Sequence, residues 1–182
     1  MRRCAWVDLQ NPLYVAYHDH EWGVPSYEDA YLFEMLLLES FQAGLSWACV
    51  LNKREAFRKA FDDFDCAKIS QYTDERVDAL MQNRDIIRNR RKITAAIRNA
   101  AVFMDIQKEY GSFSRYIWHF TEDKVIRYED GEIRATSPLS DEISNDLKKR
   151  GMSFVGSTII YAYLQAIGVI YDHEPTCDFY GK

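Results

Sequence analysis

The stretch LFEMLLLESFQAGLSW spans residues 32–47 and decides the fold. Leucine and methionine recur in it at spacings of three and four residues, which predicts an amphipathic α-helix. We expect this helix to begin at a capping box formed by Ser26 and Asp29. It should end at Gly44, because glycine accepts the left-handed conformation that closes many helices.

Capping residues predict further helices on both sides of this stretch. Ser46 caps a helix through about Ala60, and Asn89 caps a long helix that ends before Gly111. A strand pair is expected around Asp130-Gly131. The other expected helices cover about 12–18 after Asn11, 73–82 after Thr73, 112–120 after Ser112, 140–150 after Ser140, and 157–167. We therefore predict an all-α fold of two helical layers with a cleft, in which residues of about 74–109 form a helix, hairpin, helix unit.

Length and composition set limits on the function. The 182 residues suit a single domain, 1–182, and 47% of them are hydrophobic. The net charge of −5 argues against binding nucleic acid over the whole surface, so any such site must be a local basic patch. Apolar runs such as 35–38 are far too short to cross a bilayer. We expect a monomer in the cytoplasm that binds no membrane.

Two pairs of metal-ligand residues lie near the two ends of the chain. Cys4 and His18 fall in the segment 1–18, and His173 and Cys177 fall in the segment 169–182. A Cys2His2 set suits tetrahedral zinc, and four protein ligands leave no position for a reactive water. The predicted role is thus one structural zinc ion that joins the ends of the chain. Chance spacing of these residues is the alternative reading.

A carboxylate lies on the apolar face of the helix that contains the opening stretch. Glu39 stands in the middle of the face formed by Leu32, Met35 and Leu36. A buried glutamate needs hydrogen-bond partners or a changed protonation state, and is a common element of functional sites. The alternative is an internal glutamate that tyrosine hydroxyls or backbone amides satisfy. Aromatic residues nearby favour a ring-lined pocket for a flat cationic ligand: Trp6, Tyr14, Tyr17, Trp22 and Trp47.

A basic segment contrasts with the net negative charge. RDIIRNRRKITAAIR, from Arg84 to Arg98, has six basic residues and the single acid Asp85. It covers the predicted hairpin and the start of the next helix, where backbone N–H groups can bind phosphate. A solvated helix face is the alternative. A weaker candidate is the run from Lys148 to Arg150, which leads to the small residues that follow Gly156.

Taken together, these segments resemble the bacterial 3-methyladenine DNA glycosylase I family, a zinc-bearing branch of the helix-hairpin-helix DNA glycosylases. The resemblance covers nearly the whole chain. Its blocks are CAW at 4–6, PLYVAYHDHEWGVP at 12–25, the opening stretch at 32–47, IIRNRRKI at 86–93, KKRGMSFVGSTIIYAYLQAIG at 148–168, and DHEPTC at 172–177. The hairpin departs from many members of the superfamily, because its tip reads Asn-Arg-Asp where they have glycine.

The resemblance implies roles for particular residues. The zinc ligands are Cys4, His18, His173 and Cys177. The base pocket is formed by Trp6, Tyr14, Tyr17, Glu39 and Trp47, and among these Glu39 is the candidate catalytic residue. The DNA backbone is contacted through the hairpin, by Arg84, Ile87, Arg88, Arg90 and Lys92.

The implied reaction is excision of 3-methyladenine from alkylated double-stranded DNA. The nucleotide must leave the stack to reach a pocket, and the methylated adenine is cationic and therefore a good leaving group. Glu39 would accept a hydrogen bond from the exocyclic amine or favour the positive charge. Glycosylases that also cut the DNA strand use a lysine nucleophile near the hairpin. Lys92 follows the hairpin here, but in this family's pattern it faces the DNA backbone, so we expect no strand cleavage. The alternatives are a catalytically silent module that binds alkylated DNA and, less favoured, a zinc-dependent hydrolase.

Overall fold

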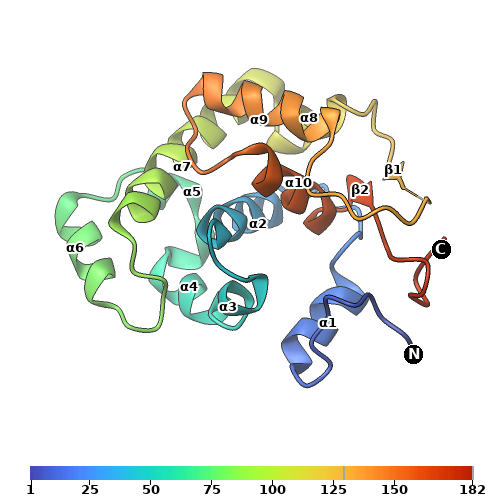
Figure 1. Cartoon of the computed structure of the whole chain (residues 1–182). Coiled ribbons are helices and arrows are strands. Elements are labelled where there is room, and N and C mark those ends of the chain that lie inside the picture. The colour runs from blue at the N-terminus through green and yellow to red at the C-terminus, as the bar shows by residue number, and fades with distance from the viewer. Residues whose placement is uncertain (129, 182) are drawn as a thin grey trace.

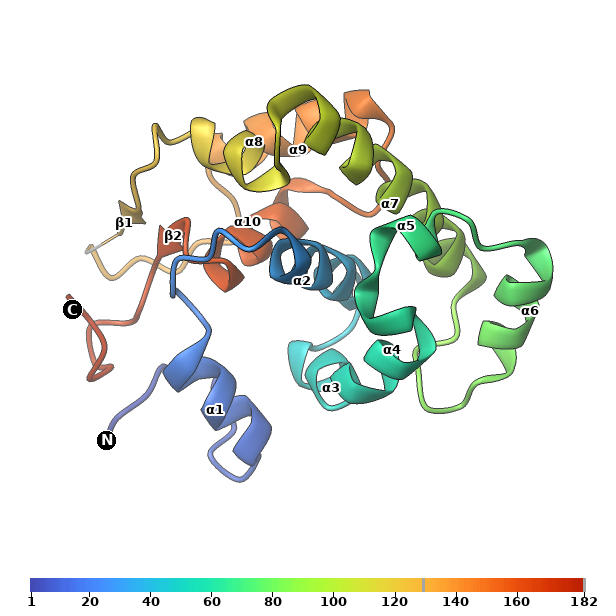
Figure 2. The same cartoon turned by 180° about the vertical axis from the view of Figure 1, so that it is seen from behind.

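A computed structural model describes residues 1–128 and 130–181, and it is mostly helical, as predicted. Figures 1 and 2 show helices packed around α2, with both chain ends on the same side of the molecule. The elements are α1 (Pro12–His20), α2 (Asp29–Gln42), α3 (Trp47–Leu51), α4 (Arg54–Ala60), the 3-10 turn η1 (Asp62–Phe64), α5 (Cys66–Ile69), α6 (Asp74–Gln82), α7 (Arg90–Tyr110), α8 (Phe113–His119), β1 (Ile126–Arg127), α9 (Pro138–Arg150), α10 (Ser157–Ala166) and β2 (Ile170–Tyr171).

Helix α2, which contains most of the opening stretch, is the central helix of the fold. It packs against α3, α7, α8 and α10, and every residue from Met35 to Phe41 is buried. A helix that is apolar on nearly all sides is stable only when other elements enclose it. The predicted two-layer arrangement is therefore too simple, because helices surround α2 rather than lie on one face of it.

Several predicted caps are confirmed. The side chain of Asn11 accepts hydrogen bonds from the backbone N–H groups of Leu13 and Tyr14 at the start of α1. The Asn89 side chain accepts from the N–H of Lys92 at the start of α7. Gly111 ends α7 with φ of 85°, a left-handed conformation that glycine adopts without steric cost.

Helix α2 begins later than predicted, and the capping box at Ser26 is wrong. Its N-cap is Glu28, and no side chain caps the first turn. The carboxylate of Asp29 instead accepts hydrogen bonds from the N–H groups of Phe113 (2.9 Å) and Ser114 (2.7 Å). Asp29 thus caps the first turn of α8 and joins that helix to α2.

The single helix expected from Ser46 to Ala60 is broken in two, because α3 ends before Arg54 and α4 begins there. The guanidinium of Arg54 is buried and donates to Glu34 on α2 (2.5 Å) and to Glu21 (2.7 Å). These ion pairs fix the start of α4 against α2. Sequence pattern alone does not reveal such a tertiary constraint.

Helix α9, in contrast, begins earlier than predicted. Its N-cap is Ser137 rather than Ser140, and Pro138 occupies the first helical position. The two serines form a capping box, in which Ser140 N donates to the Ser137 hydroxyl (3.1 Å) and Ser137 N donates to the Ser140 hydroxyl (2.8 Å).

The strand pair lies elsewhere than expected. Glu129 lies outside the described residues, and the neighbouring Asp130-Gly131 forms no strand. The pairing joins β1 and β2 in parallel, with Ile126 opposite Ile170. A parallel pair needs partners far apart in the chain, and this one brings the C-terminal tail beside the segment after α8 (Figure 1).

Close packing also fixes the segment between α1 and α2. Gly168 has φ of 74°, and a Cβ atom there would lie 2.2 Å from the backbone carbon of Val24. Only glycine permits this approach. Within the described residues, no helix has both the length and the apolar content needed to span a bilayer.

Candidate functional site

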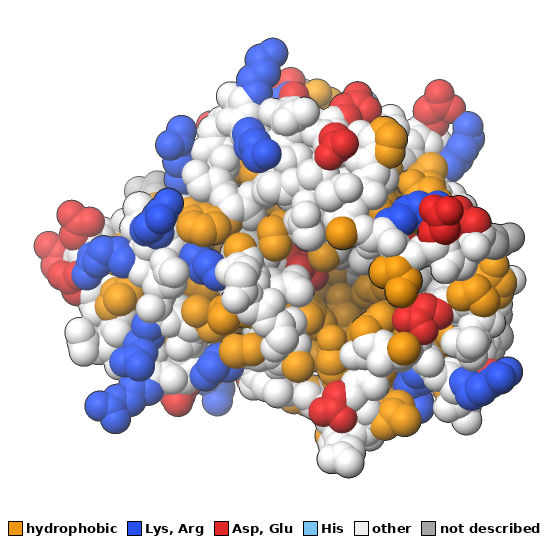
Figure 3. All heavy atoms as spheres, in the orientation of Figure 1, with side chains coloured by type: hydrophobic (Ala, Val, Ile, Leu, Met, Phe, Trp, Pro, Cys, Tyr) orange, Lys and Arg blue, Asp and Glu red, His pale blue; other side chains and the backbone are white. Residues whose placement is uncertain are grey.

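A cavity of about 240 Å³ lies between the N-terminal helices, α10 and the segments that follow β1 and β2. Figure 3 shows the hollow, whose wall is mainly hydrophobic with an acidic side chain at depth. All five residues predicted for a base pocket line it, namely Trp6, Tyr14, Tyr17, Glu39 and Trp47. The fold therefore brings together side chains from the N-terminal segment, α1, α2 and α3.

Two groups of aromatic rings line the cavity. Tyr17 and Trp47 are tilted by 48° with centroids 5.2 Å apart. In the second group, the Trp6 ring lies 5.3 Å from Tyr14 and 4.9 Å from Trp22. Burial raises the pKa of Tyr17 well above its ordinary value, so its hydroxyl stays protonated. Such walls suit a flat ligand that stacks on rings.

Glu39 places a carboxyl group in this aromatic wall. The residue is 2% exposed, and burial raises its pKa well above the ordinary value. Its Oε2 atom has no hydrogen-bond partner. The alternative of a glutamate fully satisfied by tyrosine hydroxyls or backbone amides does not fit this geometry. A cation or an N–H donor in the cavity would stabilise the charged form.

Three buried side-chain nitrogen or oxygen atoms in the described part of the chain lack a partner, and all belong to residues that line this cavity: Glu39 Oε2, Gln42 Oε1 and Trp47 Nε1. Buried polar groups are nearly always paired in folded proteins, so a cluster of exceptions at one cavity indicates a binding site. Sequence reasoning missed Gln42. The available signal was its spacing, three residues after Glu39 on the same helix.

The far rim of the cavity is polar and held in place by hydrogen bonds. Asp172 accepts from the Tyr161 hydroxyl (2.7 Å) and from Gln165 Nε2 (3.2 Å). Arg134 donates to Asp130 and to Glu132. Its guanidinium also lies 4.3 Å from the centroid of the Tyr128 ring. Sequence reasoning missed this rim, because it forms only when the tail packs beside α10.

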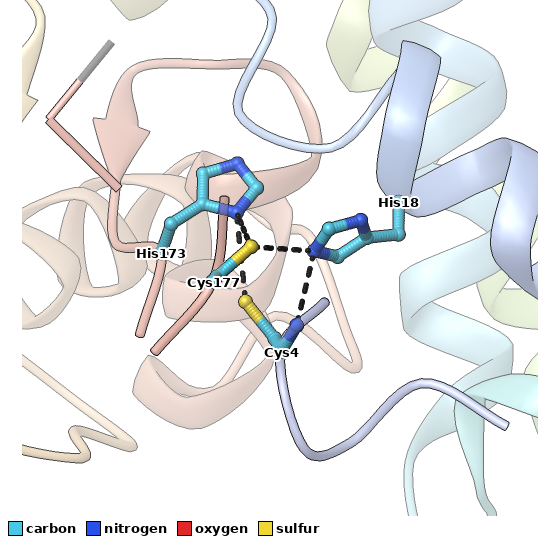
Figure 4. A group of neighbouring side chains, drawn as sticks. All are labelled: Cys4, His18, His173 and Cys177. Carbon is cyan, nitrogen blue, oxygen red and sulfur yellow. Dashed lines mark hydrogen bonds between the residues drawn. The ribbon is translucent and has the colours of Figure 1, made fainter. Parts of the chain in front are cut away.

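The four predicted metal ligands form one buried cluster. Figure 4 shows Cys4, His18, His173 and Cys177 pointing at a common centre, and their ligand atoms all lie within 4.8 Å of one another. Nδ1 of His173 is 3.5 Å from both sulfur atoms. Burial lowers the pKa of His173 to about 4 and raises that of the Cys4 thiol to about 12. The neutral imidazole is ready to bind a cation, and a cation would stabilise the thiolates.

A second layer of side chains orients His18 toward this cluster. Its Nδ1 lies 2.9 Å from the Asp19 carboxylate, while its Nε2 faces Cys177 Sγ at 3.5 Å. Arg3 in turn donates two hydrogen bonds to Asp19, at 2.7 and 2.6 Å. This carboxylate–histidine arrangement is typical of metal sites, because it fixes the tautomer and the ring orientation of the ligand. The cluster could therefore hold a metal ion.

Basic side chains lie at one side of the cavity. In Figure 3 the Lys and Arg side chains gather on the side where Figure 1 shows α6 and the start of α7. Arg84 and Arg88, in the connection between these helices, are exposed, and Ile87 is half-buried. Arg90 is exposed and paired with Asp78.

The weaker basic candidate is partly occupied within the protein. Lys148 is exposed, but Arg150 donates to Glu109 (2.6 Å) and Asp146 (2.7 Å). The charge of Arg150 is therefore already paired with carboxylates of the protein.

Lys92 does not fit its predicted contact with DNA. The residue is 6% exposed, and its ammonium donates to the carbonyl oxygens of Phe41 (2.7 Å) and Ala43 (2.6 Å). These carbonyls lie at the C-terminal end of α2, where helical partners are missing. The Lys92 ammonium is thus hydrogen-bonded within the protein, and the prediction that Lys92 contacts the DNA backbone is wrong.

Comparison with known proteins agrees with the geometry. The sequence profile described as Methyladenine glycosylase matches residues 6–180. DNA-3-methyladenine glycosylase 1 of Escherichia coli (strain K12) is 44% identical over 183 residues, which are 99% of this chain and 97% of that protein.

Solved structures agree as well. A crystal structure of 3-methyladenine DNA glycosylase I superposes with a TM-score of 0.94 at 43% identity, over 98% of this chain and 100% of the other. A variant of 3-methyladenine DNA glycosylase I in complex with 3-methyladenine also gives 0.94, at 34% identity over 100% and 99% of the two chains. Because the profile and the relatives match almost the whole chain, this protein belongs to the methyladenine glycosylase family.

Proposed function

We propose that this protein is a DNA-3-methyladenine glycosylase, a DNA-repair enzyme that hydrolyses the N-glycosidic bond of the damaged base. The observation that carries the proposal is the buried carboxyl of Glu39, which faces an aromatic cavity without a partner for Oε2. The family supports the reaction class. The whole chain would act as one glycosylase domain, as a monomer, in the cytoplasm.

The damaged nucleotide would leave the duplex and enter the cavity, because the glycosidic bond cannot be reached inside the stack. Tyr17 and Trp47 would hold the base ring, and Trp6 and Tyr14 would close the opposite side. Methylation at N3 makes the base cationic and weakens its bond to the sugar. Water then attacks the sugar carbon, the bond electrons go to the neutral base, and the enzyme forms no covalent bond with the DNA.

Electrostatics of the cavity favour a cationic base over neutral adenine. Glu39 lies at depth, and Glu132, Asp172 and Glu174 also line the cavity. Arg134 also lines the cavity, but it donates hydrogen bonds to the carboxylates of Asp130 and Glu132, which offset the positive charge of its guanidinium. Rings attract cations through their faces. Because Glu39 is buried, its carboxylate and a cationic base in the cavity would stabilise each other more strongly than they would in bulk water.

The Cys2His2 cluster would hold one structural zinc ion. Four sulfur and nitrogen ligands fill a tetrahedral shell, so Cys4, His18, His173 and Cys177 leave no position for a reactive water. The bound ion would tie the two chain ends together. This role separates the metal from the chemistry, which belongs to Glu39 and the aromatic cavity.

The partner would be double-stranded DNA that carries alkylated bases. We treat α6, α7 and the connection from Asn83 to Asn89 as a helix-hairpin-helix unit, whose exposed Arg84 and Arg88 would contact phosphates, with Ile87 between them. A groove beside it continues the basic surface. Its charged lining residues are Arg90, Arg91, Arg98 and Lys148, from the start of α7 and the end of α9.

Removing positive charge from this groove should weaken DNA binding to the same extent for every DNA sequence. The double variant Arg91→Ala/Arg98→Ala should bind duplex DNA more weakly. The slope of log affinity against log salt should fall by about 1–2, because each lost phosphate contact removes about 0.9. Fluorescence anisotropy at several salt concentrations measures both quantities. Lys108→Ala, at the opposite end of α7, is the control, and an equal change of slope in it would contradict the groove assignment.

The variant Lys92→Met should behave differently, because Lys92 is internal. Two buried carbonyls would lose their donor, at about 1–3 kcal/mol each. The melting temperature should therefore fall by roughly 5–15 °C. The salt slope of DNA binding should stay at the wild-type value. A normal melting temperature with a reduced salt slope would instead show that Lys92 contacts a DNA phosphate.

Formation of abasic sites tests the reaction itself. Duplex DNA treated with a methylating agent should gain sites that alkali converts to breaks after incubation with the protein. The strands should remain intact before alkali, because Lys92 is buried and unavailable as a nucleophile. Tight binding without abasic sites would favour the silent binding module, and breaks that form before alkali would contradict simple hydrolysis.

A further inference from the structure

Trp22 lies between the cluster of metal ligands and the aromatic cavity. It lines the cavity, yet the proposed function assigns it no role. We propose that Trp22 is a positioning residue that couples the two sites, so that a metal ion in the Cys2His2 cluster strengthens binding of the base and the base strengthens binding of the metal. The inference rests on the proposed function, because the base is the ligand of that cavity.

The Trp22 ring packs on both histidine ligands. Its centroid lies 4.6 Å from that of His173, with the ring planes at 84°, and 6.1 Å from that of His18, with the planes at 17°. His173 also has a hydrogen bond with the backbone of Trp22, while its Nδ1 atom faces the two sulfur atoms (Figure 4). A hydrogen bond of this kind fixes the orientation of a ligating imidazole. The positions of Trp22 and of the His173 ring therefore depend on each other.

The backbone around Trp22 is held between α1 and α10. Trp22 N donates to the carbonyl oxygen of Tyr17 (2.9 Å), and Gly23 N donates to that of Gln165 (2.8 Å). Tyr17 and Gln165 both line the cavity. Gly23 has φ of 78°, and a Cβ atom there would lie 3.4 Å from Nε2 of His173. This close packing leaves the segment little room to absorb a movement of the ligand.

On the side of the cavity, Trp22 supports a second ring of the wall. The centroid of Trp6 lies 4.9 Å from that of Trp22, with the planes at 67°, and 5.3 Å from that of His18. Trp6 in turn packs on Tyr14, at 5.3 Å, and follows Cys4 by two residues. Contacting rings thus lead from the metal ligands to the base pocket, and close-packed side chains transmit displacements.

This arrangement makes binding of the metal and of the base favour each other. Metal binding would fix the orientations of both histidine ligands and, through them, the positions of Trp22 and Trp6. A base that binds to a wall already in place loses less free energy in ordering it. Linkage requires the reverse effect to be equal, so the base must raise the metal affinity by the same factor. The metal would take no part in the reaction itself.

The test measures the affinity of Co²⁺ for the metal-free protein from visible absorption, with and without saturating 3-methyladenine as the free base. In the wild-type protein the base should raise the Co²⁺ affinity by at least ~10-fold. In Trp22→Leu this coupling factor should fall to about 2 or less, whereas Trp22→Phe, which keeps a ring, should retain most of it. The base should also shift the absorption bands of the Co²⁺-loaded wild-type protein, but not those of Co²⁺-loaded Trp22→Leu.

Trp47→Leu is the control, because Trp47 lines the cavity but packs on Tyr17. This variant should bind the base more weakly and keep the wild-type coupling factor. A wild-type coupling factor in Trp22→Leu would overturn the proposal. If the metal-free protein unfolds, the band shift decides, since it is measured on loaded protein, and its absence in the wild type would overturn the proposal.

Failure of the coupling can be distinguished from failure of the proposed function. An unchanged Co²⁺ affinity in a wild-type protein that binds the base and forms abasic sites would overturn the coupling alone. A wild-type protein that neither binds the base nor forms abasic sites would overturn the proposed function, and the coupling with it.

Discussion

Replacing Glu39 by glutamine is expected to slow the release of 3-methyladenine by at least ~100-fold, because the variant loses the charge that stabilises the cationic base and the best acceptor for its amine. The side chain keeps its shape, so the cavity should remain intact. Single-turnover release from methylated duplex DNA, with enzyme in excess, measures the effect without interference from product release.

The same variant should be more stable than the wild-type protein at neutral pH. Burial raises the pKa of Glu39 in the folded state, so folding favours its protonated form. That contribution to stability is complete below the ordinary pKa of about 4.3 and is lost as pH rises through the raised folded value. Glutamine cannot ionise and avoids this loss. The melting temperature of Glu39→Gln should therefore exceed that of the wild type increasingly as pH rises from about 4.3.

A matched control separates the site from the general effect of removing an acid. Glu142 is exposed on α9, and Glu142→Gln should leave both the excision rate and the melting temperature near wild-type values. A wild-type excision rate in Glu39→Gln would refute the assigned role. Slow excision together with a lowered melting temperature at neutral pH would mean that Glu39 supports the fold instead.

Loss of a metal ligand should have the largest effect on stability. Cys177→Ser is expected to abolish stoichiometric zinc binding and to lower the melting temperature by at least ~10 °C, because metal binding to a site absent from the unfolded chain contributes directly to folding. Cys177 lies in the tail and Cys4 near the N-terminus, so a bound ion would close a very long loop. Metal analysis and thermal unfolding of the same preparation test both effects.

The remaining cysteines provide the control for this prediction. Cys49 is only partly buried and lies outside the cluster, so Cys49→Ser should keep one zinc ion and a melting temperature near the wild-type value. Removing the metal from the wild-type protein with a chelator should reproduce the loss of stability. If Cys177→Ser retains the ion, or if chelation leaves the melting temperature unchanged, the structural role of the cluster is wrong.

Much of the fold followed from local rules in the sequence. Asn89 and Gly111 mark the ends of α7, because a side-chain cap and a left-handed glycine act on their own helix. Glu39 could be identified because a carboxylate on an apolar helix face contradicts its surroundings. The four metal ligands could be proposed because one cysteine and one histidine lie near each end of the chain, and the family resemblance favoured this reading over chance spacing.

What the sequence did not reveal depends on contacts between distant segments. Asp29 looks like part of a local capping box, yet it caps α8. Lys92 lies in a basic run and looks like a phosphate contact, yet α2 takes up its charge. Periodicity gives the face of a helix but not its neighbours, so the side that buries Lys92 and exposes Arg91 appears only in the packed structure.

The cavity shows the same limit. Its aromatic half comes from residues close together in the chain, and composition was enough to suggest it. Its polar half needs α10 and the tail, which the parallel pairing of β1 with β2 brings into place. Gln42 illustrates both kinds of information, because its spacing from Glu39 is local in the sequence while the missing partner of its side chain appears only in three dimensions.

The most direct test of this account is to identify the base that the wild-type protein releases. Methylated duplex DNA should be incubated with the protein, and the free bases separated by chromatography against standards. We expect 3-methyladenine to be released, while 7-methylguanine, the cationic 6-keto base of the same DNA, stays in the polymer. Release of both bases in proportion to their abundance, or of neither, would contradict a cavity that selects its base through Glu39.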